Sequence, residues 1–155
     1  MRGKVACLVG PREVAIKEFD LPEVKRDGVL LEVSKSNLCG SELHIWKFHH
    51  PLIKHAVLGH EMIGRIVALG TDVQIDYAGN PVKVGDRVVP AYFLTCQKCS
   101  NCLSGNFNLC QNAYKYWVQP PEQWPHFSGT FATHYYVHGN QYFYKVPDNV
   151  SDEAA

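Results

Sequence analysis

The chain has 155 residues, 46% of them hydrophobic, and its 15 basic and 15 acidic side chains leave no net charge. This length suits one domain with its own core, and the balanced charge argues against nucleic acid or an anionic membrane surface as a partner. The absence of a signal-peptide pattern and of any apolar run near the roughly 18 residues that span a bilayer, together with six unevenly spaced cysteines, predicts a cytoplasmic protein with no membrane partner.

The first third of the chain is predicted to be β structure. Apolar residues alternate with charged or small ones around residues 14–16, a turn is expected at 22–28, and alternation resumes over 29–33. Cys7 falls in the first strand pattern, where we expect a buried and chemically inert thiol.

Residues 40–47, GSELHIWK, predict one short helix with Ser41 as its N-cap. Residues 61–69 then predict a strand. Glycines at 59, 64 and 70 indicate bends or close backbone approaches around it.

Further short strands are predicted in the second half of the chain. A turn over 77–81 leads into a strand over 82–89, which the dipeptide Gly85-Asp86 should bend sharply. Residues 130–137 and 141–146 predict two more strands, separated by a turn at 138–140. Many short strands with little helix predict a mainly β fold in the form of a compact, partly closed barrel.

A polar loop between these strands, CQKCSNCLSGNFNLC, spaces four cysteines as CxxCxxCx7C. Structural zinc takes four thiolates at about 2.3 Å, and two CxxC steps turn successive sulfurs toward one point. A pair of disulfides is the alternative, but two-residue gaps favour a metal. We therefore predict a structural zinc lobe over about residues 92–115, with the ligands Cys96, Cys99, Cys102 and Cys110.

A second group of candidate ligands lies upstream, in CGSELH at 39–44 and GHE at 59–61. Cys39 and His60 offer the thiolate and imidazole of a catalytic zinc that keeps one position open for substrate. Glu61 is either an alternating ligand or a carboxylate behind the ligands. From spacing alone, a buried cysteine and a hydrogen-bonded core histidine are the more ordinary interpretation.

Taken together, the motifs resemble the N-terminal catalytic domain of the zinc-dependent medium-chain alcohol dehydrogenases, which has a GroES-like fold. Gly40, directly after Cys39, is more similar to threonine, sorbitol and related polyol dehydrogenases than to horse-liver-type enzymes, which carry arginine there. The resemblance covers nearly the whole chain in six ordered segments: CGSELH at 39–44, GHEMIGRIVALG at 59–70, VGDRVV at 84–89, the cysteine loop at 96–110, GTFATHYYV at 129–137 and KVPDNVSDEAA at 145–155.

This resemblance implies roles around the catalytic zinc. Cys39 and His60 would be direct ligands, and Glu61 the acidic residue beside the metal. Ser41 would hydrogen-bond the reacting alcohol and His44 would pass its proton to solvent, both near the cofactor. A helix cap and a solvated histidine are the ordinary alternatives for this last pair.

Two aromatic residues, Trp46 and Tyr92, match the wall of the family's substrate pocket, although core packing would explain each equally well. Six further histidines have no metal-ligand spacing, and we expect them in solvated loops or at strand ends: His49, His50, His55, His126, His134 and His138.

No GxGxxG motif follows any strand of this chain, so the sequence provides no site for NAD or NADP. The resemblance implies that a cofactor domain and a third ligand of the catalytic zinc follow Ala155. On this interpretation the chain is truncated and inactive alone. It would hold structural zinc tightly and catalytic zinc weakly or not at all, and the full-length protein would be a homo-oligomer.

The leading hypothesis is therefore the catalytic portion of a zinc-dependent dehydrogenase that oxidises a small alcohol or polyol, with hydride transfer to NAD or NADP. A non-catalytic, zinc-stabilised GroES-like binding module is the alternative, although it would not need the Ser41 and His44 relay. The zero net charge and the lack of a basic stripe disfavour a third possibility, a zinc ribbon that binds nucleic acid.

Overall fold

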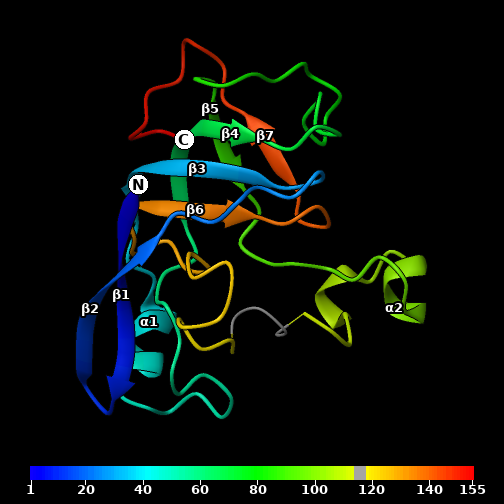
Figure 1. The fold of residues 1–155 in the computed structure, drawn as a ribbon. Coiled ribbons are helices and arrows are strands. Elements are labelled where there is room, and N and C mark those ends of the chain that lie inside the picture. The colour runs from blue at the N-terminus through cyan, green and yellow to red at the C-terminus, as the bar shows by residue number, and fades with distance from the viewer. Residues whose placement is uncertain (114–117) are drawn as a thin grey trace.

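The computed structural model describes residues 1–113 and 118–155. Strands β1 (Arg2–Gly10) and β2 (Glu13–Asp20) pair antiparallel as a hairpin, which stands crosswise at one end of the larger sheet in Figure 1. The larger sheet has the order β6-β3-β4-β5-β7, and all its neighbouring strands are antiparallel. Its strands are β3 (Val29–Ser36), β4 (Met62–Leu69), β5 (Arg87–Pro90), β6 (His134–Val137) and β7 (Phe143–Lys145).

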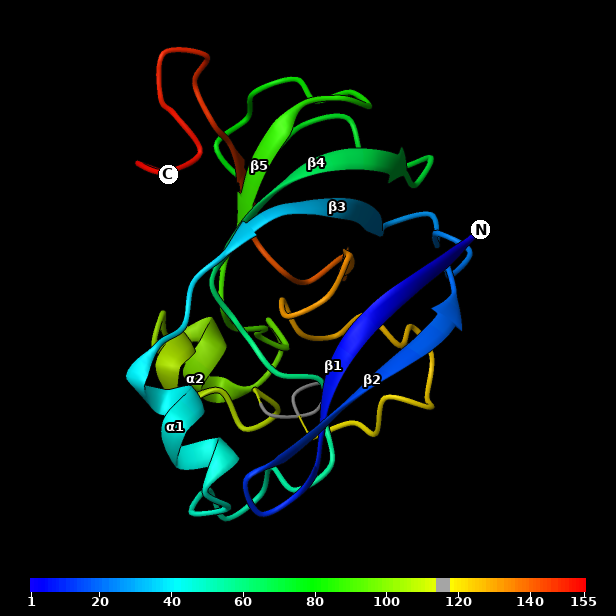
Figure 2. The same ribbon diagram turned by 90° about the vertical axis from the view of Figure 1, so that its left-hand side faces the viewer.

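Helical structure in the described part of the chain is short. Helix α1 (Gly40–Trp46) follows β3, whereas helix α2 (Ser100–Leu103) and the 3-10 helix η1 (Phe107–Leu109) lie in the cysteine loop. Neither α-helix combines the length and the apolar character that crossing a bilayer requires. Figures 1 and 2 together show that the cysteine loop extends as a separate lobe, away from α1 and the hairpin.

Each of the two sheets packs on a hydrophobic cluster of its own. The cluster on the five-stranded sheet includes Leu31, Ile66 and Val88, all at most 1% exposed. The other lies beneath the hairpin and includes Cys7 and Phe127. Cys7 is fully buried, as predicted, and this burial raises the pKa of its thiol to about 11.

Three predicted strands, now β5, β6 and β7, are shorter than the sequence suggested. Strand β7 covers only 143–145 of the predicted 141–146. Residues 82–86 form a turn rather than a strand, because Gly85 has a φ of +95° and the Asp86 carboxylate accepts a hydrogen bond from the Lys83 amide at 2.9 Å. Strand β6 begins only at His134. The preceding residues 130–133 cross between β1 and the 57–61 loop, so their backbone hydrogen bonds go to several partners instead of one strand.

The predicted bends at glycine are confirmed. In β4, a Cβ on Gly64 would lie 2.6 Å from the carbonyl oxygen of Glu32 in β3, so the two strands approach too closely there for a side chain. Before β4, Gly59 has a φ of +89°, a conformation that favours glycine. This second glycine sets the path of the loop that carries His60.

Candidate metal centres and active-site cavity

The four cysteines of the lobe come together as the spacing predicted. Their sulfur atoms all lie within 4.8 Å of one another, and the sulfurs of Cys96 and Cys102 are 4.0 Å apart. Tetrahedral zinc with ligands at 2.3 Å requires sulfur separations of about 3.8 Å, whereas a disulfide requires about 2.05 Å. None of the six cysteines is disulfide-bonded. The donor set and its spacing therefore fit a structural zinc ion.

The electrostatic surroundings of these thiols differ. Backbone N–H groups of Lys98 and Cys99 lower the pKa of the Cys96 thiol to about 6. Burial raises the pKa of the Cys102 thiol to about 12. A divalent metal would provide the positive charge that several thiolates in one partly buried cluster require.

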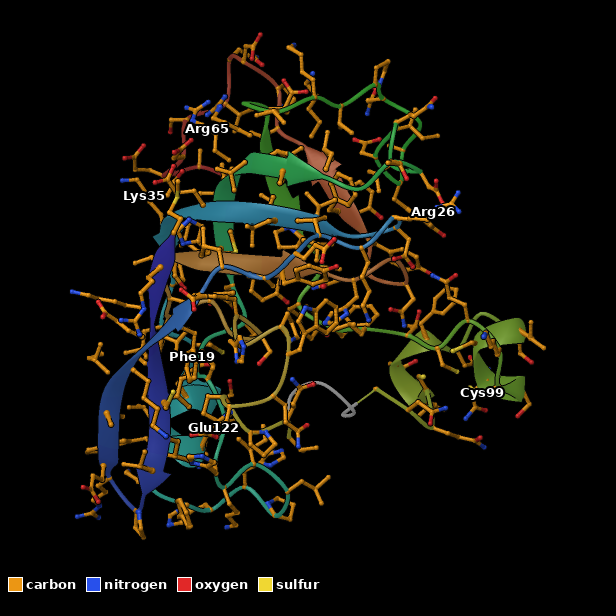
Figure 3. All side chains as sticks on the ribbon, in the orientation of Figure 1. Phe19, Arg26, Lys35, Arg65, Cys99 and Glu122 are labelled. Atoms are coloured by element: carbon orange, nitrogen blue, oxygen red, sulfur yellow. The ribbon has the colours of Figure 1, made fainter. Side chains whose placement is uncertain are left out.

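The four-cysteine cluster lies on the opposite side of the molecule from the β1–β2 hairpin. Figure 3 shows Cys99 in the lobe at one side of the molecule, with Phe19 and Glu122 at the other. The lobe was predicted to extend to about residue 115; its last two residues, 114 and 115, lie outside the described residues.

A second group of ligand atoms forms where α1 approaches the loop before β4. Donor atoms of Cys39, Glu42 and His60 lie within 4.8 Å of one another. Cys39 and His60 were predicted to meet here, and the structure brings them together from segments that α1 and the 47–59 loop separate. Glu42, at 3% exposed, is a third member that the sequence analysis did not identify.

The start of α1 explains why Glu42 points inward. The N-cap is Cys39, not Ser41 as predicted, and Ser41 lies inside the first helical turn. The Glu42 carboxylate folds back and accepts a hydrogen bond from the Cys39 amide at 2.9 Å. Glu42 is the third residue of the helix, and its side chain thus provides an acceptor for the Cys39 amide, which has no partner within the helix.

The same carboxylate also orients the histidine. The other oxygen of Glu42 lies 2.6 Å from Nδ1 of His60. An ionised carboxylate only accepts hydrogen bonds, so Nδ1 carries the proton and Nε2 is the ring nitrogen with a lone pair for a metal. Glu42 therefore acts behind the ligands, and the thiolate and imidazole fit the predicted zinc site.

Glu61 lies at the outer side of this group. One of its carboxylate oxygens is 3.7 Å from Nε2 of His60, and the side chain is 44% exposed. It is not among the three residues whose donor atoms cluster most tightly. Direct coordination by Glu61 thus stays a prediction.

A cavity of about 330 Å³ opens over the second group. Cys39, Ser41 and His60 line it, and so does Tyr92, whose ring centroid is 6.0 Å from that of His60. Its remaining walls combine apolar and polar residues: Glu42, Ile45, His50, Ile53, Val57, Leu58, Gly59 and Ser128. A small molecule in this cavity would contact the metal ligands and the predicted hydroxyl together.

Two predicted residues lie outside the set that lines this cavity. Trp46 ends α1, and its carbonyl accepts a hydrogen bond from the Arg12 amide at 2.7 Å. His44 is exposed three residues after Ser41, with its ring centroid 6.3 Å from that of His49. An exposed histidine one helical turn from Ser41 fits a route toward solvent, whereas the structure gives Trp46 no contact with the cavity.

His50 is a cavity residue that the sequence analysis assigned to a solvated loop. Its Nδ1 accepts hydrogen bonds from the amides of Leu52 at 3.3 Å and Ile53 at 3.0 Å. Burial, followed by the charge of Lys54, lowers its pKa. No local motif marks this role. For Glu42, by contrast, the spacing of three residues from Cys39 was a signal that a capping analysis would have found.

Replacing Glu42 with glutamine should weaken metal binding at the Cys39 and His60 site by about 10- to 100-fold, the usual effect of losing a group behind a ligand. The Cys39 amide and Nδ1 of His60 use different oxygens of the Glu42 carboxylate, and in glutamine one of these two positions becomes an NH₂ group, which donates and cannot accept. Competition with a chromophoric chelator measures the affinity. Glu13→Gln, on the exposed face of β2, is the control, and equal affinities for both variants would contradict the assignment.

Comparisons with known proteins agree with this geometry. The family model described as the alcohol dehydrogenase GroES-like domain matches residues 25–148. L-threonine 3-dehydrogenase from Pectobacterium atrosepticum is 34% identical over 157 residues, which cover 98% of this chain and 40% of the relative. Sorbitol dehydrogenase from Bacillus subtilis is 32% identical, with the same two coverages.

A solved alcohol dehydrogenase from Thermotoga maritima has a similar structure, with a TM-score of 0.88 at 25% identity over 99% of this chain and 43% of that one. The chain thus spans about 40% of the length of these curated relatives. The solved Thermotoga maritima protein shares the mainly β architecture with short helices over the length of this chain.

Proposed function

The chain belongs to the alcohol dehydrogenase GroES-like domain family, and from this premise we propose that it is the catalytic domain of a zinc- and NAD(P)-dependent dehydrogenase of alcohols or polyols. The observation that carries the proposal is the convergence of Cys39, His60 and Ser41 on one cavity. In this proposal the domain spans residues 1–155, with a structural zinc lobe at about 92–115. Assembly into a homo-oligomer and a cytoplasmic location stay predictions.

The residues of the second group would hold and orient the catalytic zinc. Cys39 and His60 provide two ligand atoms, and Glu42 fixes the His60 ring through Nδ1. Zinc bound there supplies Lewis acidity, which favours loss of a proton from a substrate hydroxyl at neutral pH. Glu61, beside Nε2 of His60, is in reach to complete or exchange with the ligand set.

Ser41 and His44 would move the proton. A hydroxyl both donates and accepts, so Ser41 can take the proton of the reacting alcohol while it passes its own onward. His44 lies exposed on the same helix, three residues after Ser41, where its imidazole can accept a proton and release it to solvent. A bound NAD(P) would supply the hydride acceptor for oxidation of the alcohol to an aldehyde or ketone, and the role of Ser41 and His44 would be to carry the released proton to solvent.

The composition of the cavity favours a substrate with more than one polar group. Ile53, Val57 and Leu58 can enclose its carbon chain and exclude water. His50 and Ser128 place further hydrogen-bonding groups in the same cavity. The names of the threonine and sorbitol dehydrogenase relatives describe such substrates, and a polyol is accordingly the first substrate class to assay.

The direct experiment is a spectrophotometric assay of the complete gene product, with polyols and with NAD or NADP. We expect alcohol-dependent reduction of one nucleotide, and a zinc-loaded protein with no turnover would favour the non-catalytic binding module. Residues 1–155 by themselves should show no reduction. Among the described residues every strand pairing is antiparallel, so no βαβ unit for a dinucleotide occurs there.

Replacing His44 with alanine in the complete gene product should lower kcat by about 10²-fold, the lower end of what a proton-transfer group contributes. Added imidazole should restore part of the rate. His49→Ala removes a neighbouring exposed histidine and should leave the rate unchanged; equal losses in both variants would count against the relay.

A further inference from the structure

The carbonyl oxygen of Glu61 is a meeting point of three chain segments. It accepts hydrogen bonds from the Asn37 amide at 3.1 Å, from the Ser36 hydroxyl at 2.9 Å and, at 3.4 Å, from the Thr130 hydroxyl. Most backbone carbonyls have one or two donors. Here the donors come from two segments far apart in the sequence, 36–37 and 130, and together they hold this peptide unit in place more firmly than a strand ladder would.

The two hydroxyl groups also bond to each other, at 2.8 Å. Each hydroxyl has one proton. Ser36 gives its proton to the Glu61 carbonyl, so the single Thr130 proton is shared in a three-centre hydrogen bond, with the Ser36 oxygen at 2.8 Å as the nearer acceptor and the Glu61 carbonyl at 3.4 Å as the farther one. Thr130 is 1% exposed, whereas Ser36 is half-buried.

The backbone around Thr130 reinforces the same loop. The Thr130 amide donates to the Gly59 carbonyl at 3.1 Å, and the Phe131 amide donates to the Leu58 carbonyl at 2.9 Å. A Cβ on Gly59 would lie 2.4 Å from the Thr130 hydroxyl oxygen. The segment GTF, 129–131, is therefore packed directly against the residues that carry His60.

The segments joined at this carbonyl are the two that carry the proposed metal ligands. Ser36 ends β3 and lies three residues before Cys39, while the Glu61 carbonyl follows His60 directly. Because a metal site tolerates errors of only about 0.5 Å, the distance between such segments has to be held by groups outside the ligand set. The Ser36 and Thr130 hydroxyls lie between the segment that leads to Cys39 and the segment that carries His60, so they can fix the distance between the two segments.

We propose that Thr130, acting through Ser36, is a positioning residue that sets the separation of Cys39 and His60. This inference rests on the proposed metal-dependent function and deepens it, because it assigns a role to the GTF segment. Packing alone would not require a hydroxyl at position 130, since valine has the same shape. The hydroxyl is needed to complete the bonds to Ser36 and to the Glu61 carbonyl.

The test is a Co²⁺ titration of the complete gene product with its four-cysteine lobe already loaded with Zn²⁺, followed by visible absorption. A Cys39→Ser variant identifies the absorption that belongs to the second site. Thr130→Val should weaken Co²⁺ binding there by about 10-fold or more and alter its absorption bands. Thr130→Ser, which keeps the hydroxyl, should restore both. Thr133→Val is the matched control, since its hydroxyl bonds to the Lys4 amide instead.

The possible outcomes separate the two claims. If the unchanged complete protein shows no Co²⁺ signal that depends on Cys39, the proposed metal site itself is wrong. If the site binds Co²⁺ but Thr130→Val changes only the melting temperature, Thr130 is a packing residue and the positioning role is refuted. Should Thr130→Val not fold, Ser36→Ala removes the other hydroxyl from a half-buried position and must reproduce the loss of affinity.

Discussion

Replacing Cys102 with serine is expected to remove about one zinc ion per chain and to unfold the lobe. Zinc in such sites contributes about 10–16 kcal/mol of apparent binding free energy in small zinc-dependent peptides, and that energy is also folding energy. The lobe has little else to replace it, because its helices are only four and three residues long and Leu103 and Leu109 are exposed.

Metal analysis by mass spectrometry and limited proteolysis measure these two effects. The variant should lose zinc and become cleavable by protease within residues 96–110. The β-sheet signal in its circular dichroism spectrum should not change. Cys7→Ala is the control, since Cys7 is buried in the hydrophobic cluster beneath the hairpin and belongs to neither group of candidate metal ligands. A Cys102→Ser protein that kept both its zinc and its resistance to protease would contradict the structural zinc site.

Replacing Ser41 with alanine in the complete gene product is expected to lower kcat by about 10²- to 10⁴-fold. Ser41 lines the cavity beside Cys39 and His60, and alanine there cannot accept the proton of the alcohol or pass one to His44. Zinc content should not change, because Ser41 is not among the clustered ligand atoms.

Steady-state kinetics and zinc analysis on the same preparation separate a relay from a defect in metal binding. The exposed Ser34→Ala change in β3 is the matched control and should behave as the unchanged protein does. The relay would be wrong if kcat fell only in proportion to lost zinc. Threonine at position 41 should retain most of the rate, since it keeps the hydroxyl.

The secondary structure was predictable where one local pattern dominates. Alternation around residues 29–33 and 61–69 predicted β3 and β4, because one face of each strand is buried against the core. The helix start was misplaced at Ser41 because serine is a favoured cap. The actual cap, Cys39, is stabilised by the Glu42 side chain, which the choice of cap residue alone does not reveal.

The metal ligands show the same division. The four cysteines span 15 residues of one loop, so their spacing alone carried the information. Cys39 and His60 were paired through a family resemblance and not through their spacing, since 20 residues lie between them. His50 carried no signal at all, because only the fold of the 47–59 loop turns it into the cavity.

The sequence by itself determined the mainly β fold class, the four-cysteine lobe and the family, because these depend on local periodicity, short spacings and ordered motifs. Only the tertiary structure decided that Glu42 orients His60 and that Thr130 and Ser36 meet at the Glu61 carbonyl. The physical reason is distance along the chain. Hydrogen bonds between residues 18 and 69 positions apart exist only after the strands and loops between them have packed.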